Sequence, residues 1–319
     1  MAFTTDSGGV EIAFERLDAP AGSASAAGSA SAAGSASAAG SASAAGSAAT
    51  ATVVFAHATG FCGSVWRPVR EALRTPVDAW TLDVRGHGRS GTPEGEFRWE
   101  DTASDVLAVL DAVRGAAGDG PVGPVIGVGH SMGGAAVLLA EIARPGTFAA
   151  IWAYEPIVIP ADIVAATAGM PNPLAVGARR RRAAFASRAE ARANYASKPP
   201  MNTFVPAALD AYIEGAMLDE PDGSARLACR PEVEAGIYQS GSEHSAWDRL
   251  GEVGCPVVVA AGREEPFSPA AFAARIAERL PHGRLERHDE LAHFGPMERP
   301  ASVAASIDAV LHTVLAELG

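Results

Sequence analysis

Short apolar runs alternate along this chain with longer stretches in which apolar residues recur every third or fourth position. Runs of the first kind are typical of buried strands, and the longer spacing is typical of helices with one buried face. We expect strands at residues 10–16, 52–56, 79–84, 124–129, 149–155, 256–262 and 283–289. We expect helices at residues 99–113, 132–143, 269–280 and 301–318. Such alternation predicts an α/β fold, with a mostly parallel sheet covered by helices on both faces.

The alternation stops between residues 156 and 250. This interval has no clear strand pattern, several prolines and helical stretches at residues 173–196 and 206–217. We interpret it as a helical cap inserted into a core formed by residues 1–155 and 251–319.

A low-complexity tract occupies residues 21–48, where AGSASA occurs four times in succession. Glycine and serine recur in every period and no large apolar residue is present, so the tract has nothing with which to pack a core. It separates two strand-like runs, residues 10–16 and 52–56. We therefore interpret it as a flexible loop that enlarges the connection of a hairpin.

Charge and length narrow the classes of function. The chain has 319 residues, enough for a substantial core, and a formal net charge of −12. Because binding to phosphate backbones needs a basic face, the charge argues against a nucleic-acid partner. A cofactor or another small molecule remains open as a partner.

The cysteines and the lengths of the apolar runs indicate the cellular compartment. Cys62, Cys229 and Cys255 are odd in number and lack the spacing of metal ligands, which indicates a reduced, cytoplasmic protein without a structural zinc site. The N-terminus shows no signal-peptide pattern. The longest apolar run, residues 125–140, is interrupted by His130 and Ser131 and is shorter than the ~20 residues of a membrane span, so no membrane association is expected.

Residues 125–138, VIGVGHSMGGAAVL, contain the most informative motif. A dinucleotide-binding G-x-G-x-x-G does not fit, because Gly133 comes one residue late and the segment lies deep in the chain. The pattern G-x-S-x-G does fit, with Ser131 between an expected strand and an expected helix. This turn presents its serine as a nucleophile and directs the backbone N–H of Met132 toward an oxyanion.

Two further glycine-containing segments follow expected strands. The first, FAHATGFCGSVW at residues 55–66, can supply a second oxyanion donor, for which the N–H of Thr59 is the first choice and that of Phe61 the second. The second, DVRGHGRSG at residues 83–91, contains His87, for which we favour a structural role in a turn.

Together, HATGFCGSVW, DVRGHGRSG, GHSMGG and LAHFGPMERP resemble, in this order, the motifs of the α/β-hydrolase superfamily. The resemblance covers nearly the whole chain outside the repeat. It implies a doubly wound, mostly parallel eight-stranded sheet, a cap after the sixth strand, and a catalytic triad in the chain order nucleophile, acid, histidine.

The same resemblance suggests the triad members. Ser131 matches the nucleophile, and His293 in LAHF matches the general base, since imidazole titrates near neutrality. The family usually takes its acid from a loop after the seventh strand, which favours Glu265 in GREEP. Glu155 in AYEP, at the end of the sixth strand, is the alternative, and Glu264 and Asp289 are less favoured candidates.

Two remaining features are interpreted as structural. The arginines at 179–182 are expected on a cap helix as a salt-bridged surface rather than as a site for an anionic substrate group. Cys62 has no evident activating neighbour and is expected to be an inert small residue.

The expected activity is hydrolysis of a carboxylic ester-type bond through an acyl-enzyme, with no metal and no organic cofactor. Cofactor-free perhydrolase (haloperoxidase-like) chemistry and carbon–carbon bond hydrolysis need the same residues and remain alternatives. A binding protein without catalysis is a further alternative, which intact Ser131 and His293 disfavour. The physiological substrate, the acyl chain length and the oligomeric state are not specified by these patterns.

Overall fold

The computed structural model describes residues 2–18, 51–117, 123–265 and 268–317. The repeat at 21–48 lies outside the described residues. The strands on its two sides, β2 (Val10–Leu17) and β3 (Thr52–Ala56), are not neighbours, because β4 (Asp78–Leu82) pairs with both of them. The expectation of a hairpin connection is therefore wrong: the segment between β2 and β3 joins strands on either side of a third.

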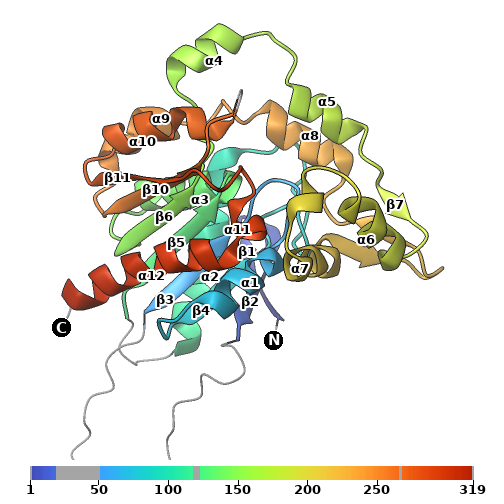
Figure 1. The fold of residues 1–319 in the computed structure, drawn as a ribbon, viewed down its shortest axis with the longest axis horizontal. Helices are drawn as coiled ribbons and strands as arrows, with labels where there is room; N and C mark the ends of the chain where they lie inside the picture. Colours follow the sequence, from blue (N-terminus) through green and yellow to red (C-terminus); the bar gives the residue numbers. More distant parts are fainter. Residues whose placement is uncertain (1, 19–50, 118–122, 266–267, 318–319) are drawn as a thin grey trace, which may run out of the picture.

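A single eight-stranded sheet forms the centre of the molecule (Figure 1). Its order is β1-β2-β4-β3-β5-β6-β10-β11, with antiparallel pairing at β1–β2 and β2–β4 and parallel pairing elsewhere. The other members are β1 (Ala2–Ser7), β5 (Val125–His130), β6 (Ala150–Tyr154), β10 (Val257–Gly262) and β11 (Gly283–His288). The expected fold class, including the number of strands, is confirmed.

Alternate side chains of the central strands pack on opposite faces of this sheet. In β5, Val125 joins one apolar cluster, whereas Ile126 and Val128 join the other. The same period of two divides Val257 and Val258 of β10 between the clusters. Because both faces are buried, these strands are almost continuously apolar, which is why they were recognisable in the sequence.

Helices cover both faces. One cluster includes residues of α2 (Trp99–Ala117), α3 (Met132–Ala143) and α10 (Ala273–Arg279), and the other includes residues of α1 (Arg67–Ala72) and α12 (Pro300–Glu317). Short 3-10 helices precede α1 and α10, namely η1 (Gly63–Trp66) and η4 (Pro269–Phe272). A further helix, α11 (Gly295–Glu298), precedes α12. No helix in the described parts of the chain combines the length and apolar character needed to cross a bilayer.

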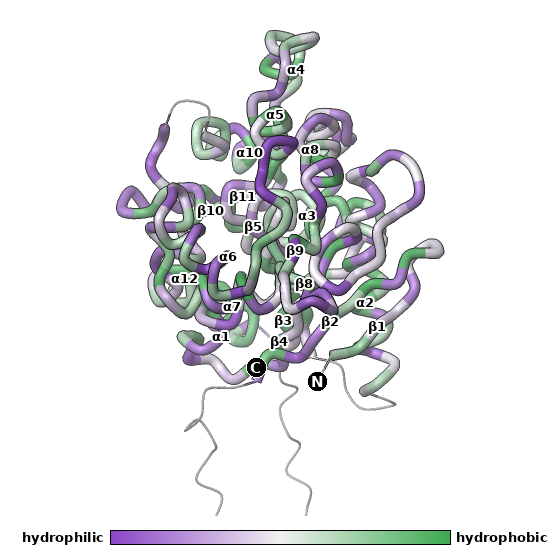
Figure 2. The backbone as a smooth tube through the Cα atoms, turned by 90° about the vertical axis from the view of Figure 1, so that its right-hand side faces the viewer, coloured by the Kyte–Doolittle hydropathy of each residue, from purple (hydrophilic) through white to green (hydrophobic). Residues whose placement is uncertain are grey.

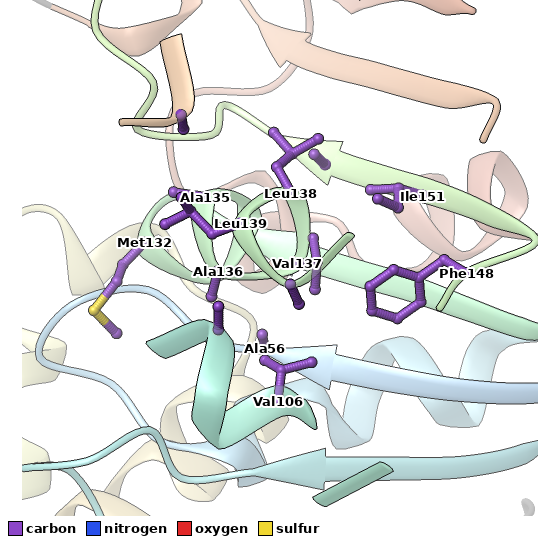
Figure 3. Close-up of a cluster of buried hydrophobic side chains, with 14 of the residues drawn as sticks. Ala56, Val106, Met132, Ala135, Ala136, Val137, Leu138, Leu139, Phe148 and Ile151 are labelled. Atoms are coloured by element: carbon purple, nitrogen blue, oxygen red, sulfur yellow. The ribbon is translucent and has the colours of Figure 1, made fainter. Parts of the chain in front are cut away.

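Helix α3 is the most deeply buried of these helices. Figure 3 shows its side chains, among them Ala136 and Val137, packed with Val106 of α2, Ala56 of β3 and Ile151 of β6. All residues from Met132 to Ile142 are buried. The helix is therefore fixed at the centre of the fold, and its first turn has a defined position at the carboxyl end of the sheet.

Most of the interval 156–250 lies beyond the carboxyl ends of the parallel strands (Figures 1 and 2), whereas its last helices pack against α3 and α10. The segment from residue 156 to residue 252 forms α4 (Ala161–Thr167), α5 (Pro173–Arg179), β7 (Ala184–Phe185), α6 (Arg188–Ala196), η2 (Met201–Thr203), α7 (Pro206–Ala216), β8 (Met217–Asp219), β9 (Ala225–Leu227), α8 (Pro231–Gln239), α9 (Ala246–Arg249) and η3 (Leu250–Glu252). The small antiparallel sheet β7-β9-β8 corrects the expectation of an interval without strands, since strands this short leave no periodic pattern. The division of the chain into core and cap stays a prediction.

Candidate active site

Ser131 occupies a sharp turn between β5 and α3. Its backbone has φ 56° and ψ −114°, a strained conformation for a residue with a side chain. Two sets of bonds hold it there: its N–H donates to Tyr154 O (2.9 Å), and its carbonyl accepts from the N–H groups of Ala135 (3.2 Å) and Ile157 (3.1 Å). The strain is thus imposed by the core, and it places the serine at the carboxyl end of the sheet.

The glycines of the pentapeptide are required by close approach of the backbone. A Cβ on Gly133 would lie 2.1 Å from Ala56 O, and a Cβ on Gly129 would lie 2.3 Å from Gly133 O. Both atoms belong to rigid backbone, so neither clash can be relieved by a side-chain rotation. The strand-to-helix turn can therefore form at Ser131 only with glycine at both positions.

A buried carboxylate is hydrogen-bonded to His293. Nδ1 of His293 lies 2.7 Å from Oε2 of Glu155, whose side chain has no exposed surface. A proton on Nδ1 donates to this carboxylate, which leaves Nε2 as the basic nitrogen of a neutral ring. The His293 side chain is 25% exposed, so the ring is accessible on its other side.

Glu155 is itself tightly held. It follows β6 directly with φ 43°, and its N–H donates to Ala260 O (2.8 Å). Its Oε1 accepts the N–H of Gly262 (2.9 Å), and the hydroxyl of Ser268 donates to Oε2 (3.4 Å). The carboxylate therefore has partners for both oxygens and a fixed orientation toward His293.

This arrangement corrects the expectation for Glu265, which does not contact His293. Its side chain is 50% exposed and bonds Arg263 Nε at 2.8 Å. Glu264 pairs with Arg287, so it is directed elsewhere too. The physical reason is that β6 and β10 are adjacent: Glu155 immediately follows the end of β6, whereas Glu265 comes later, after β10 has already ended at Gly262.

The loop that carries His293 is held by hydrogen bonds from the core. Three successive carbonyls accept bonds from core residues: Leu291 O from the N–H of Arg263 (2.9 Å), Ala292 O from the hydroxyl of Tyr154 (2.7 Å), and His293 O from Nε2 of His130 (2.8 Å). His130 is fully buried, and burial, followed by the nearby His293, lowers its pKa well below the usual value. Sequence reasoning assigned no role to His130, although its place beside the serine in the pentapeptide was a signal that it lies near the site.

The segment after β3 presents a backbone N–H in a defined direction. Ala58 O accepts from Nδ1 of His57 (2.8 Å) and from the N–H of Phe61 (3.1 Å). In a trans peptide the carbonyl and the next N–H point in opposite directions, so these bonds also orient the N–H of Thr59. Within the described residues, the N–H groups of Thr59 and Met132 have no protein acceptor, whereas that of Phe61 is occupied.

Two buried histidines, His57 and His87, hold this segment by hydrogen bonds. Nε2 of His87 accepts the N–H of Gly60 (2.9 Å), and Nε2 of His57 accepts the N–H of Val84 (3.0 Å). Burial lowers the pKa of His57 to about 4; burial, with His57 as the next cause, lowers that of His87 to about 3. Both rings are thus neutral acceptors, and His87 has a structural role of the kind that the sequence favours.

These two histidines predict a pH dependence of stability. In the unfolded chain they bind protons near pH 6.5, whereas in the folded protein they stay neutral until about pH 4 and about pH 3. Their contribution is therefore fully present above pH 6.5 and is lost as the pH falls toward 4, by on the order of a few kcal/mol. Urea unfolding at pH 7.5, 6 and 5 is expected to show a falling midpoint. His87→Gln, whose amide oxygen can still accept from Gly60, is expected to show a shallower fall; equal slopes would contradict this account.

Cys62 follows the same segment but is not a candidate nucleophile. It is fully buried, its Sγ lies 3.2 Å from the hydroxyl oxygen of Ser64, and burial, followed by the charge of Asp83, raises its pKa to about 12. A thiol that stays protonated is a poor nucleophile. Its role is packing, in line with the interpretation from sequence.

Comparison with known proteins agrees with this geometry. A sequence model of the alpha/beta hydrolase family matches residues 53–306. The chain is 25% identical over 264 residues to 3-oxoadipate enol-lactonase 2 of Acinetobacter baylyi. This alignment covers 81% of this chain and 88% of that protein.

Solved structures show the same fold. The peroxisomal alpha-beta-hydrolase Lpx1 of Saccharomyces cerevisiae superposes with a TM-score of 0.73 at 20% identity, over 84% of this chain and 77% of that one. E-2-(acetamidomethylene)succinate hydrolase superposes with a TM-score of 0.69 at 17% identity, over 98% of this chain and 99% of that one. At these identities the likeness concerns the fold.

Proposed function

The chain belongs to the alpha/beta hydrolase family, and from this premise we propose that it is a serine hydrolase that cleaves a carboxylic ester-type bond of a small molecule through an acyl-enzyme. The observation that carries the proposal is the 2.7 Å bond between His293 and the buried Glu155, in a molecule whose strained turn presents Ser131 at the same end of the sheet. Glu155 takes the place in the triad that the sequence favoured for Glu265.

In the proposed mechanism, Oγ of Ser131 attacks the acyl carbonyl carbon while Nε2 of His293 accepts the hydroxyl proton. The carbonyl oxygen becomes an oxyanion, and the N–H groups of Met132 and Thr59 donate to it. Collapse of this intermediate breaks the ester C–O bond, and His293 returns the proton to the leaving alcohol. Water, deprotonated by the same histidine, then attacks the acyl carbon. The bond to Oγ of Ser131 breaks, His293 returns the proton to Oγ, and the acid is released.

Glu155 serves this cycle by keeping the Nδ1 proton of His293 in place. The resulting imidazolium is stabilised by the carboxyl group of Glu155, which is hydrogen-bonded on both oxygens. The N–H of Met132 lies at the beginning of a twelve-residue helix, where the helix dipole favours negative charge. These features support transition-state stabilisation by groups that need no rearrangement during the reaction.

The proposal extends to a cyclic or open ester because the curated relative is named an enol-lactonase, and a lactone is an ester. An aromatic cluster begins beside the histidine: the ring of Phe294 lies edge-on to that of His293, with 5.0 Å between centroids. The rings of Phe61 and Phe204 pack against Phe294, with centroids at 5.5 and 5.6 Å. This environment favours an apolar part of the substrate beside the base.

The experiment that tests the proposal is a substrate panel on the wild-type protein. We expect turnover of p-nitrophenyl esters of graded acyl length and of a simple enol lactone, because the same triad serves both. Two further assays, peroxide-dependent oxidation with acetate and hydrolysis of a vinylogous dione, test the perhydrolase and carbon–carbon alternatives. Turnover in either of these without turnover of any ester or lactone would contradict the proposal.

A further inference from the structure

An ion pair of the cap is packed directly against the segment that carries Thr59. Nη1 of Arg181 bonds Oε2 of Glu234 at 2.7 Å, with side-chain exposures of 19% and 7%. A Cβ built on Gly60 would lie 2.6 Å from Oε1 of Glu234 and 3.1 Å from Nη1 of Arg181. The two side chains therefore lie directly against the backbone at Gly60, where φ of 78° favours glycine.

Arg181 is not part of an exposed arginine surface. Helix α5 ends at Arg179, so the four consecutive arginines do not share a helix, which corrects the expectation for this run. Arg180 and Arg182 are exposed, whereas the guanidinium of Arg181 turns inward. Its Nη2 donates to the hydroxyl groups of Tyr195 (3.2 Å) and Tyr212.

One guanidinium thus joins three helices of the cap. Tyr195 belongs to α6, Tyr212 to α7 and Glu234 to α8, and Arg181 itself follows α5. The ring of Tyr212 also lies 5.2 Å from that of Phe61, in the same segment after β3. The cap helices therefore contact residues 58–61 at two places, through the ion pair at Gly60 and through the ring of Tyr212 at Phe61.

Gly60 is also fixed by hydrogen bonds within the core. Its N–H donates to His87, and the preceding residues are fixed through Ala58 O as described above. Arg181 is close enough to His87 for its charge to help lower the pKa of that ring, after the larger effects of burial and His57. The charge of Arg181 thus also favours the neutral form of His87, the acceptor on which the Gly60 N–H depends.

We propose that Arg181 and Glu234 are positioning residues. They pack as a brace from the cap against Gly60 and thereby fix the direction of the Thr59 N–H, which donates a hydrogen bond to the oxyanion. This inference rests on the proposed function for its effect on catalysis, but the brace itself is a property of the fold. Arg181 already has Glu234 and two tyrosine hydroxyls as partners, so its guanidinium is used within the protein.

The test compares Arg181→Gln, Glu234→Gln and the double variant with Arg180→Gln, which removes the exposed neighbouring charge. Two p-nitrophenyl esters of equal length, one with a neutral and one with a carboxylate-terminated acyl chain, are used as substrates. Hydrogen–deuterium exchange of residues 57–63 is measured in parallel.

We expect Arg181→Gln to lower kcat by about 10- to 100-fold for both esters, since a displaced oxyanion donor affects the transition state more than the bound substrate. KM is expected to change little, and residues 57–63 are expected to exchange faster. The double variant is expected to recover part of kcat, because it does not leave Glu234 buried without its partner. Arg180→Gln is expected to behave as the wild type in both measurements.

Two results would overturn the inference. One is exchange at residues 57–63 in Arg181→Gln and Glu234→Gln equal to that in Arg180→Gln. The other is a defect confined to KM for the carboxylate ester, which would make Arg181 a substrate-binding residue. A wild-type protein that turns over no ester or lactone of the panel would instead refute the proposed function, and faster exchange in the variants would then still support the brace.

Discussion

Ser131→Ala is expected to lower kcat on the best ester of the panel by roughly 10⁴- to 10⁶-fold. The variant lacks the hydroxyl that forms the acyl-enzyme, so only transition-state stabilisation by backbone N–H groups and binding remains. The fold is expected to persist, because the contacts of Ser131 that shape the turn are backbone contacts, to Tyr154, Ala135 and Ile157. The measurement is steady-state kinetics at saturating ester, with thermal unfolding recorded for the same sample.

A matched control is Ser302→Ala, a serine of α12 outside the candidate site. It is expected to retain wild-type kcat. Ser131→Ala with activity within about tenfold of the wild type, at a similar melting temperature, would mean that another group is the nucleophile.

The sheet was largely predictable because its strands are buried on both faces. Apart from Thr52 at the start of β3, the runs at β3 and β10 contain no polar residue, and their short length is typical of strands. β1 was missed for the opposite reason: AFTTDS is mostly exposed, and its strand conformation depends on pairing with β2. The pattern of apolar residues thus reports burial, and strands at an exposed edge carry little of it.

The proposed triad acid shows where local motifs stop being informative. The sequence offers carboxylates at the ends of two different strands, and both strands end near the histidine loop. Which carboxylate reaches Nδ1 depends on the path of the chain beyond each strand, and that path is set by tertiary contacts. Glu155 is turned inward by its positive φ and by the N–H of Gly262. Neither feature has a counterpart in the sequence pattern.

The roles of the polar residues that support the candidate site could not be predicted from the sequence either. His130 and Arg181 are visible as residues, but their partners lie 163 and 53 positions away along the chain. A helical pattern through residues 173–196 also suggested that the arginines share one helix, whereas the chain leaves the helix at Arg179. Long-range pairs of this kind follow from the fold, so they become predictable only after the fold is known.

Glu155→Gln is expected to lower kcat by about 10³- to 10⁴-fold. The amide can still accept the N–H of Gly262, but it cannot stabilise the imidazolium of His293 and can hold the ring in the wrong tautomer. Because binding of the ester does not use this group, KM is expected to change much less than kcat. Kinetics over a range of ester concentrations, with melting temperatures alongside, separates the two effects.

The most direct test of the triad Ser131–His293–Glu155 is kcat of Glu155→Gln and Glu265→Gln on the same ester under the same conditions. Glu265 is half exposed and bonded to Arg263, so its replacement removes only a surface ion pair, which contributes little to stability. We therefore expect kcat of Glu265→Gln to stay within about twofold of the wild type. The account predicts a loss of at least about 10³-fold for Glu155→Gln alone. A large loss in Glu265→Gln with near wild-type kcat in folded Glu155→Gln would contradict it.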